Sequence, residues 1–272
     1  MTGSQATEYD DQHHPLVKRV ASGELATEPM RTRPRGANAR APRRKSKVRR
    51  MVGWVVKLAL GWIMLSVLMV GLYRFVPPPV TLTMIGDLFA GHGIAKQWMP
   101  LSQMDPSMAR AAISAEDSRF CLHHGFDFTA IEKAYQRNET GRHHIRGGST
   151  ISQQTAKNVF LWQGGGYFRK GLEAWFTLLI ENIWGKRRIM EVYLNVAETG
   201  IGTYGANAGA MRYFHHDASQ LSPREAAQIA AVLPLPKKRA AVAPSGFTRR
   251  YANAITARIG VVRNGGLDRC MR

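Results

Sequence analysis

The sequence contains very little cysteine. Cys121 and Cys270 are the only two among 272 residues, which is too few for a disulfide framework, and their spacing matches no metal-binding signature. A bond between them is compatible with an oxidising compartment, but nothing in the sequence favours it, so their redox state stays open. The GxxxxGK[ST] pattern of a P-loop is absent, and neither an internal repeat nor an alternating strand pattern is evident. These absences argue against a disulfide-rich scaffold, a P-loop enzyme, a repeat protein and an all-β fold.

Acidic residues are scarce relative to basic ones. The chain has 38 lysines and arginines against 19 acidic residues, a formal charge of +19. Residues 1–76 carry 14 basic and 5 acidic residues, and residues 77–272 carry 24 and 14, so both parts are basic. A basic surface indicates an anionic partner, either nucleic acid, phospholipid headgroups or a phosphorylated substrate. The plain alternative is general solubility.

Large apolar residues are rare in residues 1–50, where ten of the twenty positions from Arg31 to Arg50 are lysine or arginine. Such a segment buries too little apolar surface to fold alone, so we predict a disordered basic tail. A nucleic-acid-binding arm is an alternative, but the segment that follows favours a membrane-associated role without nucleic acid. Residues 52–76 are almost wholly apolar, and the span reaches the roughly 20 residues needed to cross a bilayer if Lys57 and Arg74 extend to the interfaces. We predict a transmembrane signal anchor over residues 52–76, with a buried core helix as the alternative.

The basic run precedes the apolar segment, and this arrangement predicts which side of the membrane each part occupies. The positive-inside rule keeps residues 1–50 in the cytoplasm and places everything after Phe75 outside. Pro77, Pro78 and Pro79 follow in place of a small-residue cleavage site, so we expect the anchor to be uncleaved. The expected location is therefore a membrane, with a single span and the domain outside. Together with the family resemblance described below, this means the bacterial inner membrane and a periplasmic domain.

The sequence of residues 77–272 predicts a mainly α-helical fold. Residues 77–104 are predicted to be a linker and domain entry with some short extended structure, residues 105–262 the domain, and residues 263–272 a C-terminal tail. Asp105 and Pro106 predict the start of a helix that carries Glu116 near its end. Capping boxes are predicted at Thr129 and at Ser222. Further helices are expected after Ser149, from Phe168 to about Trp184, and from Lys186 to Asn195, where Gly185 leaves open whether the last two are continuous.

Two carboxylates stand out within residues 116–173. Chemistry at a sugar anomeric carbon needs carboxylates near one bond, one of which moves a proton. Glu116 is one candidate. Glu173 is the other, and its helical neighbours Arg169 and Lys170 also make it a candidate for an ordinary surface ion pair. The Gly147–Thr150 segment is similar to a helix start that holds phosphate, and Lys157 lies two turns further on.

Four motifs in order make the pattern specific: EDxxFxxHxGxD (Glu116–Asp127), GGSTISQQ (Gly147–Gln154), RKxxE (Arg169–Glu173) and KxxIxExYLN (Lys186–Asn195). This set resembles the glycosyltransferase domain that polymerises peptidoglycan glycan strands in bifunctional penicillin-binding proteins and in monofunctional membrane-anchored enzymes. The resemblance covers about residues 80–260. Ser-x-x-Lys and Lys-Thr-Gly are both absent, which excludes a penicillin-binding transpeptidase and favours the monofunctional, biosynthetic kind.

The resemblance implies a lysozyme-like fold with a large head and a small membrane-proximal jaw, to which residues 127–147 would belong. It implies transfer from a lipid-linked glycan chain to lipid II, with inversion and release of undecaprenyl pyrophosphate. Glu116 matches the general base, and Glu173 matches a carboxylate that organises the pyrophosphate, with a divalent cation (Mg²⁺ or Mn²⁺) as an open question. The implied substrate-binding residues are Lys133, Ser149, Gln154, Lys157, Arg169, Lys170 and Lys186. Cell-division or elongation proteins are candidate partners.

The sequence departs from this family at one place. Many members carry an arginine four residues before the Arg-Lys pair, where this chain has Gly165. A cationic contact is therefore lost, or another residue such as Arg146 supplies it. Two alternatives to the glycosyltransferase stay open at this point: a lysozyme-like enzyme that cleaves peptidoglycan, and a non-catalytic scaffold for wall assembly.

Overall fold

The computed structural model describes residues 47–139 and 148–271. Helices dominate these residues, as expected. In chain order they are α1 (Lys47–Phe75), α2 (Leu82–Phe89), α3 (Pro106–Glu116), α4 (Phe128–Glu139), α5 (Ile151–Phe160), α6 (Gly166–Ile183), α7 (Lys186–Val196), α8 (Ala206–Phe214), α9 (Pro223–Val232), α10 (Gly246–Asn264) and the 3₁₀ helix η1 (Arg269–Met271). The predicted basic tail lies outside the described residues except for residues 47–50, as do Arg146 and most of the loop after α4.

The 29-residue helix α1 has the length and the composition of a membrane span, with a mean hydropathy of 2.2 over its most apolar window. Its C-terminal half packs against α6. The indole of Trp175 donates a hydrogen bond to Ser66 Oγ at 3.1 Å, and the indole of Trp184 donates to the Val70 carbonyl at 2.7 Å. The anchor helix is therefore joined to the domain by specific polar contacts inside an apolar contact surface.

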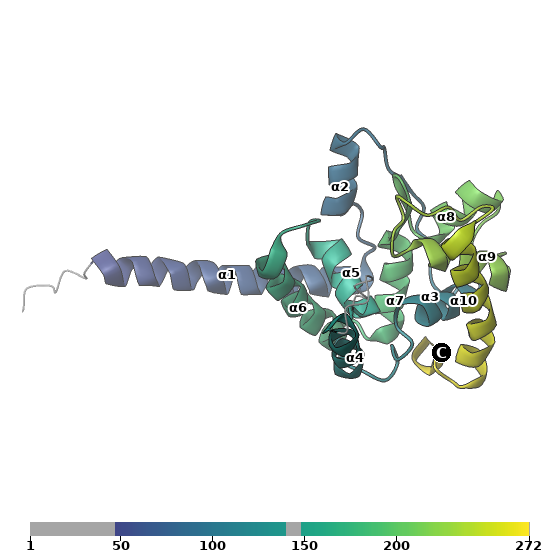
Figure 1. Cartoon of the computed structure of the whole chain (residues 1–272). Coiled ribbons are helices and arrows are strands. Elements are labelled where there is room, and N and C mark those ends of the chain that lie inside the picture. Colours follow the sequence, from purple (N-terminus) through teal and green to yellow (C-terminus); the bar gives the residue numbers. More distant parts are fainter. Residues whose placement is uncertain (1–46, 140–147, 272) are drawn as a thin grey trace, which may run out of the picture. The chain divides into compact units, whose positions relative to one another are not determined.

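Three helices with small buried side chains form one side of the core. α3, α9 and α10 pack on one another, and Figure 1 shows them side by side. α3 buries Ala111 and Ala112, while α9 buries Ala226 and Ala230. Because the distance between packed helices depends on the side chains at the contact, alanines let these helices approach closely. The end of α3, which carries Glu116, is thereby fixed.

The other side of the core is aromatic. α5 packs against both α6 and α7, and Phe160 of α5 stacks on Phe176 of α6 with ring centroids 4.5 Å apart. α6 and α7 are separate helices, because Gly185 between them has a φ of 76°, which only glycine adopts readily. This packing holds α5, with its candidate site residues, between α6 and α7.

Several local predictions are confirmed and others are wrong. Asp105 caps α3 and Ser222 forms the capping box of α9, as expected. The predicted box at Thr129 is wrong, because α4 begins earlier: Asp127 Oδ1 accepts the Ala130 amide at 3.0 Å and pairs with Arg119 at 3.3 Å. The linker also contains a helix that the sequence did not suggest, α2, which Thr81 caps.

A small mixed sheet was not predicted. β1 (Ala95–Lys96), β2 (Glu198–Gly200) and β3 (Thr203–Tyr204) form it in the order β1-β3-β2. β3 pairs in parallel with β1 and antiparallel with β2, which carries a bulge. Strands of two or three residues are too short to show an alternating pattern, which explains the miss. The sheet places Glu198 and Tyr204 beside α2.

Cys121 and Cys270 form a disulfide, which settles a question that the sequence left open. The bond joins the segment after Glu116 to the C-terminal 3₁₀ helix across 149 residues of sequence. Leu267 and Met271 pack against the core alongside it. A bond that closes so long a loop restricts the unfolded chain strongly, which in the loop-entropy model is worth on the order of 4 kcal/mol.

Candidate active site

Glu116 is the last residue of α3, and one of its carboxylate oxygens has no hydrogen-bond partner among the described residues. Oε2 accepts a hydrogen bond from Gln154 Nε2 of α5 at 2.8 Å, while Oε1 is buried and unpaired. Burial raises the pKa of Glu116 above its usual value, and the bond from Gln154 and the charge of Arg239 oppose this only in part. A carboxylate in this state is suited to accept a proton at Oε1.

The neighbouring Asp117 has a structural role. Its carboxylate lies 3.0 Å from His123 Nε2 and accepts the backbone amide of Ile151 at 3.0 Å. It therefore ties the end of α3 to the first residue of α5. Adjacent carboxylates at a helix end point in different directions, and here one anchors the structure while the other stays available.

The start of α5 is fixed by a capping box between Thr150 and Gln153. Thr150 also donates a hydrogen bond to the Gly125 carbonyl at 2.6 Å. Gly125 has a φ of 88°, and a Cβ there would lie 2.8 Å from a methyl group of Thr177. The glycine therefore allows the loop to pass close to α6, and the box sets the rotation of α5 that brings Gln154 to Glu116.

Glu173 is buried on α6 and holds two cations. Arg169 Nη1 lies 2.8 Å from its Oε2, and Lys170 pairs with its Oε1. Lys170 also donates to Ser149 Oγ at 3.3 Å, just before α5. The predicted i, i+4 and i, i+3 pairs are both present, but Glu173 is only 2% exposed, so this is not an ordinary surface ion pair.

Lys157 connects the two carboxylates electrostatically. Burial lowers the pKa of its amine, the charges of Glu173 and Glu116 oppose that change, and Arg169 and Lys170 add to it. Lys157 is thus a largely desolvated cation close enough to sense both acids. An anion placed beside it would be stabilised more strongly than in water.

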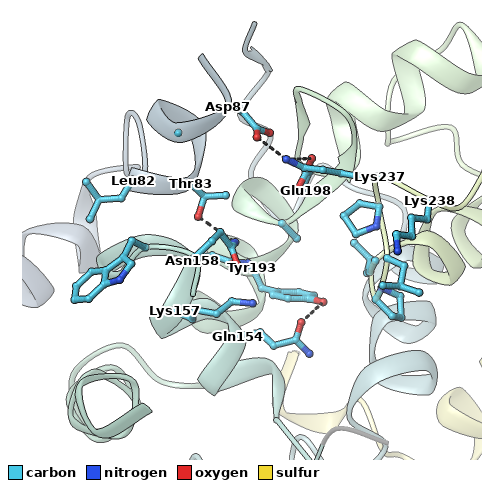
Figure 2. A pocket seen from close by; sticks show the side chains of 18 residues that line it. Leu82, Thr83, Asp87, Gln154, Lys157, Asn158, Tyr193, Glu198, Lys237 and Lys238 are labelled. Atoms are coloured by element: carbon cyan, nitrogen blue, oxygen red, sulfur yellow. Dashed lines mark hydrogen bonds and ion pairs between the residues drawn. The ribbon is translucent and has the colours of Figure 1, made fainter. Parts of the chain in front are cut away.

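A cavity of about 650 Å³ opens beside these residues. Gln154, Lys157 and Asn158 of α5 line it together with Tyr193 of α7, and α2 and residues 233–238 complete its walls. Figure 2 shows Lys157 and Gln154 on one edge of the cavity, with Gln154 near the Tyr193 hydroxyl. Glu116 and Glu173 lie behind this lining, linked to it through Gln154 and Lys157. The volume is that of a ligand site for a small molecule or a few sugar units.

Comparison with known proteins decides the family. The transglycosylase family model matches residues 83–259, more than half of the chain. The chain belongs to the transglycosylase family. A biosynthetic peptidoglycan transglycosylase of Caulobacter vibrioides is 52% identical over 200 residues, which cover 74% of this chain and 87% of that protein. Proteins of the same description from Xanthomonas campestris and Rhodospirillum centenum are 48% and 47% identical, covering 78% and 82% of this chain and 87% and 95% of theirs.

The transglycosylase is therefore a peptidoglycan glycosyltransferase that polymerises glycan strands. Its monofunctional relatives lack a transpeptidase. The family has a lysozyme-like fold, in agreement with the mainly helical structure. The match over residues 83–259 also includes α2, which we had assigned to the linker.

Among the predicted substrate-binding residues whose side chains are described, Lys186 does not join this cluster. Lys133 lies on α4, and its side chain is outside what the structure describes. Lys186 pairs with Glu181 at 2.6 Å and lies over the Phe120 ring, 4.6 Å from its centroid. Ser149, Gln154, Lys157, Arg169 and Lys170 lie close to one another and to Glu116 and Glu173, and their contact with substrate stays a prediction.

Gly165 has a conformational role. It precedes α6 with a φ of 91°, and a Cβ there would lie 2.9 Å from both Arg169 Cβ and Trp162 Nε1. Arg169 in turn donates a hydrogen bond to the Gly164 carbonyl. An arginine at position 165 would strain this turn and displace Arg169, so it would not simply restore a missing cationic contact in this transglycosylase.

A divalent cation does not fit the residues as arranged. Both oxygens of Glu173 are held by Arg169 and Lys170. Among the described residues, no three histidine, cysteine, aspartate or glutamate side chains gather as metal ligands. Glu173 therefore positions cations of the protein itself.

Sequence reasoning missed several residues at the site. Arg239 contributes positive charge near Glu116, and Asp87, Glu198 and Lys237 line the cavity. Asp87 lies in the supposed linker and Lys237 in a turn after α9. No motif or helical spacing connects them, so only the fold could have shown that they meet.

Proposed function

We propose that this transglycosylase joins lipid II to a lipid-linked glycan chain, with Glu116 as the general base. The observation that supports this is the buried Oε1 of Glu116, which has no hydrogen-bond partner within residues 47–139 and 148–271 and lies near the cations of α5 and α6. Oε1 takes the proton from the acceptor 4-hydroxyl as that oxygen forms a bond to the donor anomeric carbon. The bond from that carbon to the diphosphate breaks, and the pyrophosphate leaves with the electron pair. Attack opposite the leaving group inverts the anomeric carbon.

The cations have a separate role in the proposal. Lys157, Arg169 and Lys170 face the charge that develops on the departing diphosphate, and Ser149 adds a hydroxyl beside Lys170. Glu173 holds Arg169 and Lys170 in place, so that no rearrangement is needed when charge develops. Lys133 and Lys186 are proposed to contact substrate from the acceptor side and from α7. Partners among cell-division or elongation proteins belong to the same proposal.

The test is direct. The full-length protein in detergent, given fluorescent lipid II and no ATP, should form glycan polymer, because the diphosphate leaving group supplies the driving force. Finished peptidoglycan should not be cut in the same preparation. Cleavage of finished strands without polymer formation would contradict the proposal and favour a hydrolase.

The proposed orientation places the N-terminus in the cytoplasm and the domain outside. The basic run before α1 supports it, and so does the Cys121–Cys270 disulfide, since such bonds persist in oxidising compartments. In membranes alkylated before lysis, we expect mass spectrometry to find these two cysteines joined, and proteases added to spheroplasts to digest a C-terminal tag. Two alkylated thiols together with a protected tag would reverse the orientation.

A further inference from the structure

The helix α2 forms one wall of the cavity, and a buried carboxylate on it makes polar contacts with the rest of the domain. Its two buried residues are Met84 and Asp87. Asp87 Oδ2 accepts a hydrogen bond from the Tyr204 hydroxyl of β3 at 2.6 Å, and Oδ1 lies 2.5 Å from Lys237 Nζ. The opposite face of α2 exposes large apolar side chains such as Leu88 and Phe89. Asp87 therefore supplies the polar attachment of this wall, beside the apolar attachment through Met84, and His92 Nδ1 also lies 3.6 Å from its Oδ1.

Lys237 comes from the turn after α9 and meets two acids at once. Besides the bond to Asp87, its ammonium lies 3.7 Å from Glu198 Oε1 of β2. All three residues line the cavity. Figure 2 shows them together above it, with Lys157 and Gln154 below, so they bound the end away from the proposed chemistry. We call Asp87, Lys237 and Glu198 the clasp.

The two acids of the clasp differ in the direction of their pKa shifts. Burial would raise the pKa of Asp87, but the hydrogen bonds from Lys237 and Tyr204 lower it below its usual value. Burial raises the pKa of Glu198 to about 7 against the charge of Lys237, and the charge of Asp87 and a hydrogen bond with Asp87 act in the same direction as burial. Lys237 is thus the cation that lets two neighbouring, mostly buried acids coexist. Without it, the acids would repel each other, and α2 is the element that carries one of them.

We propose that the clasp holds α2 in place as a wall of the cavity and thereby determines the length of the glycan product. The inference rests on the proposed polymerase function. A polymer that stays bound between additions must lie in the cavity beyond its reacting end. The cavity runs from Gln154 and Lys157 toward the clasp, so α2 is the wall that would hold this part of the chain. Asp87 and Lys237 act as positioning residues, since they set the distance between α2 and the turn after α9.

The test compares two adjacent lysines in the full-length protein at pH 8. Lys237→Met should shorten the glycan product by about two- to fivefold on gels, the effect expected of a partly exposed ion pair. Lys238→Met is the matched control, because Lys238 lines the same cavity and no ion pair is recorded for it in the described structure. Lys237→Arg should preserve product length. Glu198→Gln added to Lys237→Met should restore it in part, because it removes the repulsion.

A second readout does not depend on activity. Amide hydrogen exchange in residues 82–89 should be faster in Lys237→Met than in the wild type, and unchanged in Lys238→Met. The proposal would be overturned if Lys237→Met made product of wild-type length and showed wild-type exchange in residues 82–89. It would also be overturned if Lys238→Met shortened the product equally. A wild-type protein that makes no polymer would overturn the proposed function, while the exchange measurement would still decide whether Lys237 holds α2.

Discussion

Replacing Glu116 with glutamine is expected to lower the rate of glycan polymerisation by about 10²–10⁴-fold, the usual contribution of a general base. The amide keeps the shape of the side chain, and it can still accept the hydrogen bond from Gln154. It has no basic oxygen to take the proton from the acceptor hydroxyl. The loss should therefore fall on the chemical step and leave the fold unchanged.

The measurement is the initial rate with fluorescent lipid II, with circular dichroism to compare the folds. Glu132→Gln is a suitable control, because Glu132 is an exposed glutamate on α4. The wild-type rate should also fall as the solution becomes more acidic, with an apparent pKa above that of an ordinary glutamate, since burial raises the pKa of Glu116. A Glu116→Gln enzyme with the wild-type rate would remove the proposed base.

Replacing Lys157 with methionine is the second large effect, and we expect a loss of about 10²–10³-fold in kcat, as when one preorganised donor to a developing anion is removed. Lys157 is desolvated and lies in the field of both Glu116 and Glu173. Its charge is most useful when the diphosphate departs, so kcat should change more than KM. Methionine fills similar space, which limits disturbance of the packing of α5.

The control for this variant is Lys238→Met, which removes one positive charge from the same cavity lining. Lys157→Arg should retain part of the activity because the charge remains. If Lys157→Met raised KM alone and left kcat intact, Lys157 would bind the substrate without stabilising the leaving group.

How much of this could be predicted depended on the distance in sequence over which each interaction acts. Local signals were sufficient for Asp105 and Ser222, whose caps involve residues two or three positions away. The helix at α2 was missed because its short apolar sequence gave no clear period. The start of α4 was misplaced because Asp127, which also pairs with Arg119, is a better cap than Thr129.

The same distinction between local and long-range interactions applies to the candidate site. Arg169, Lys170 and Glu173 share one helix face, so their ion pairs could be predicted from spacing. The link between Glu116 and Gln154 spans 38 residues and depends on how α3 and α5 pack. The resemblance to the glycosyltransferases identified both residues without showing that they touch. Asp87 and Lys237 are 150 residues apart, and neither spacing nor resemblance joined them.

The contacts between α1 and α6 bear on how this enzyme should be prepared. A fragment cut after residue 76 would lose the Val70 carbonyl that accepts the buried indole N–H of Trp184, and the partner of the Trp175 indole as well. Trp62 would also no longer cover the rings of Trp175 and Phe176, so apolar surface that α1 buries would face water. Removal of α1 to gain solubility would therefore expose an aromatic surface that favours aggregation. Purification should keep α1 and supply a detergent micelle or nanodisc around it.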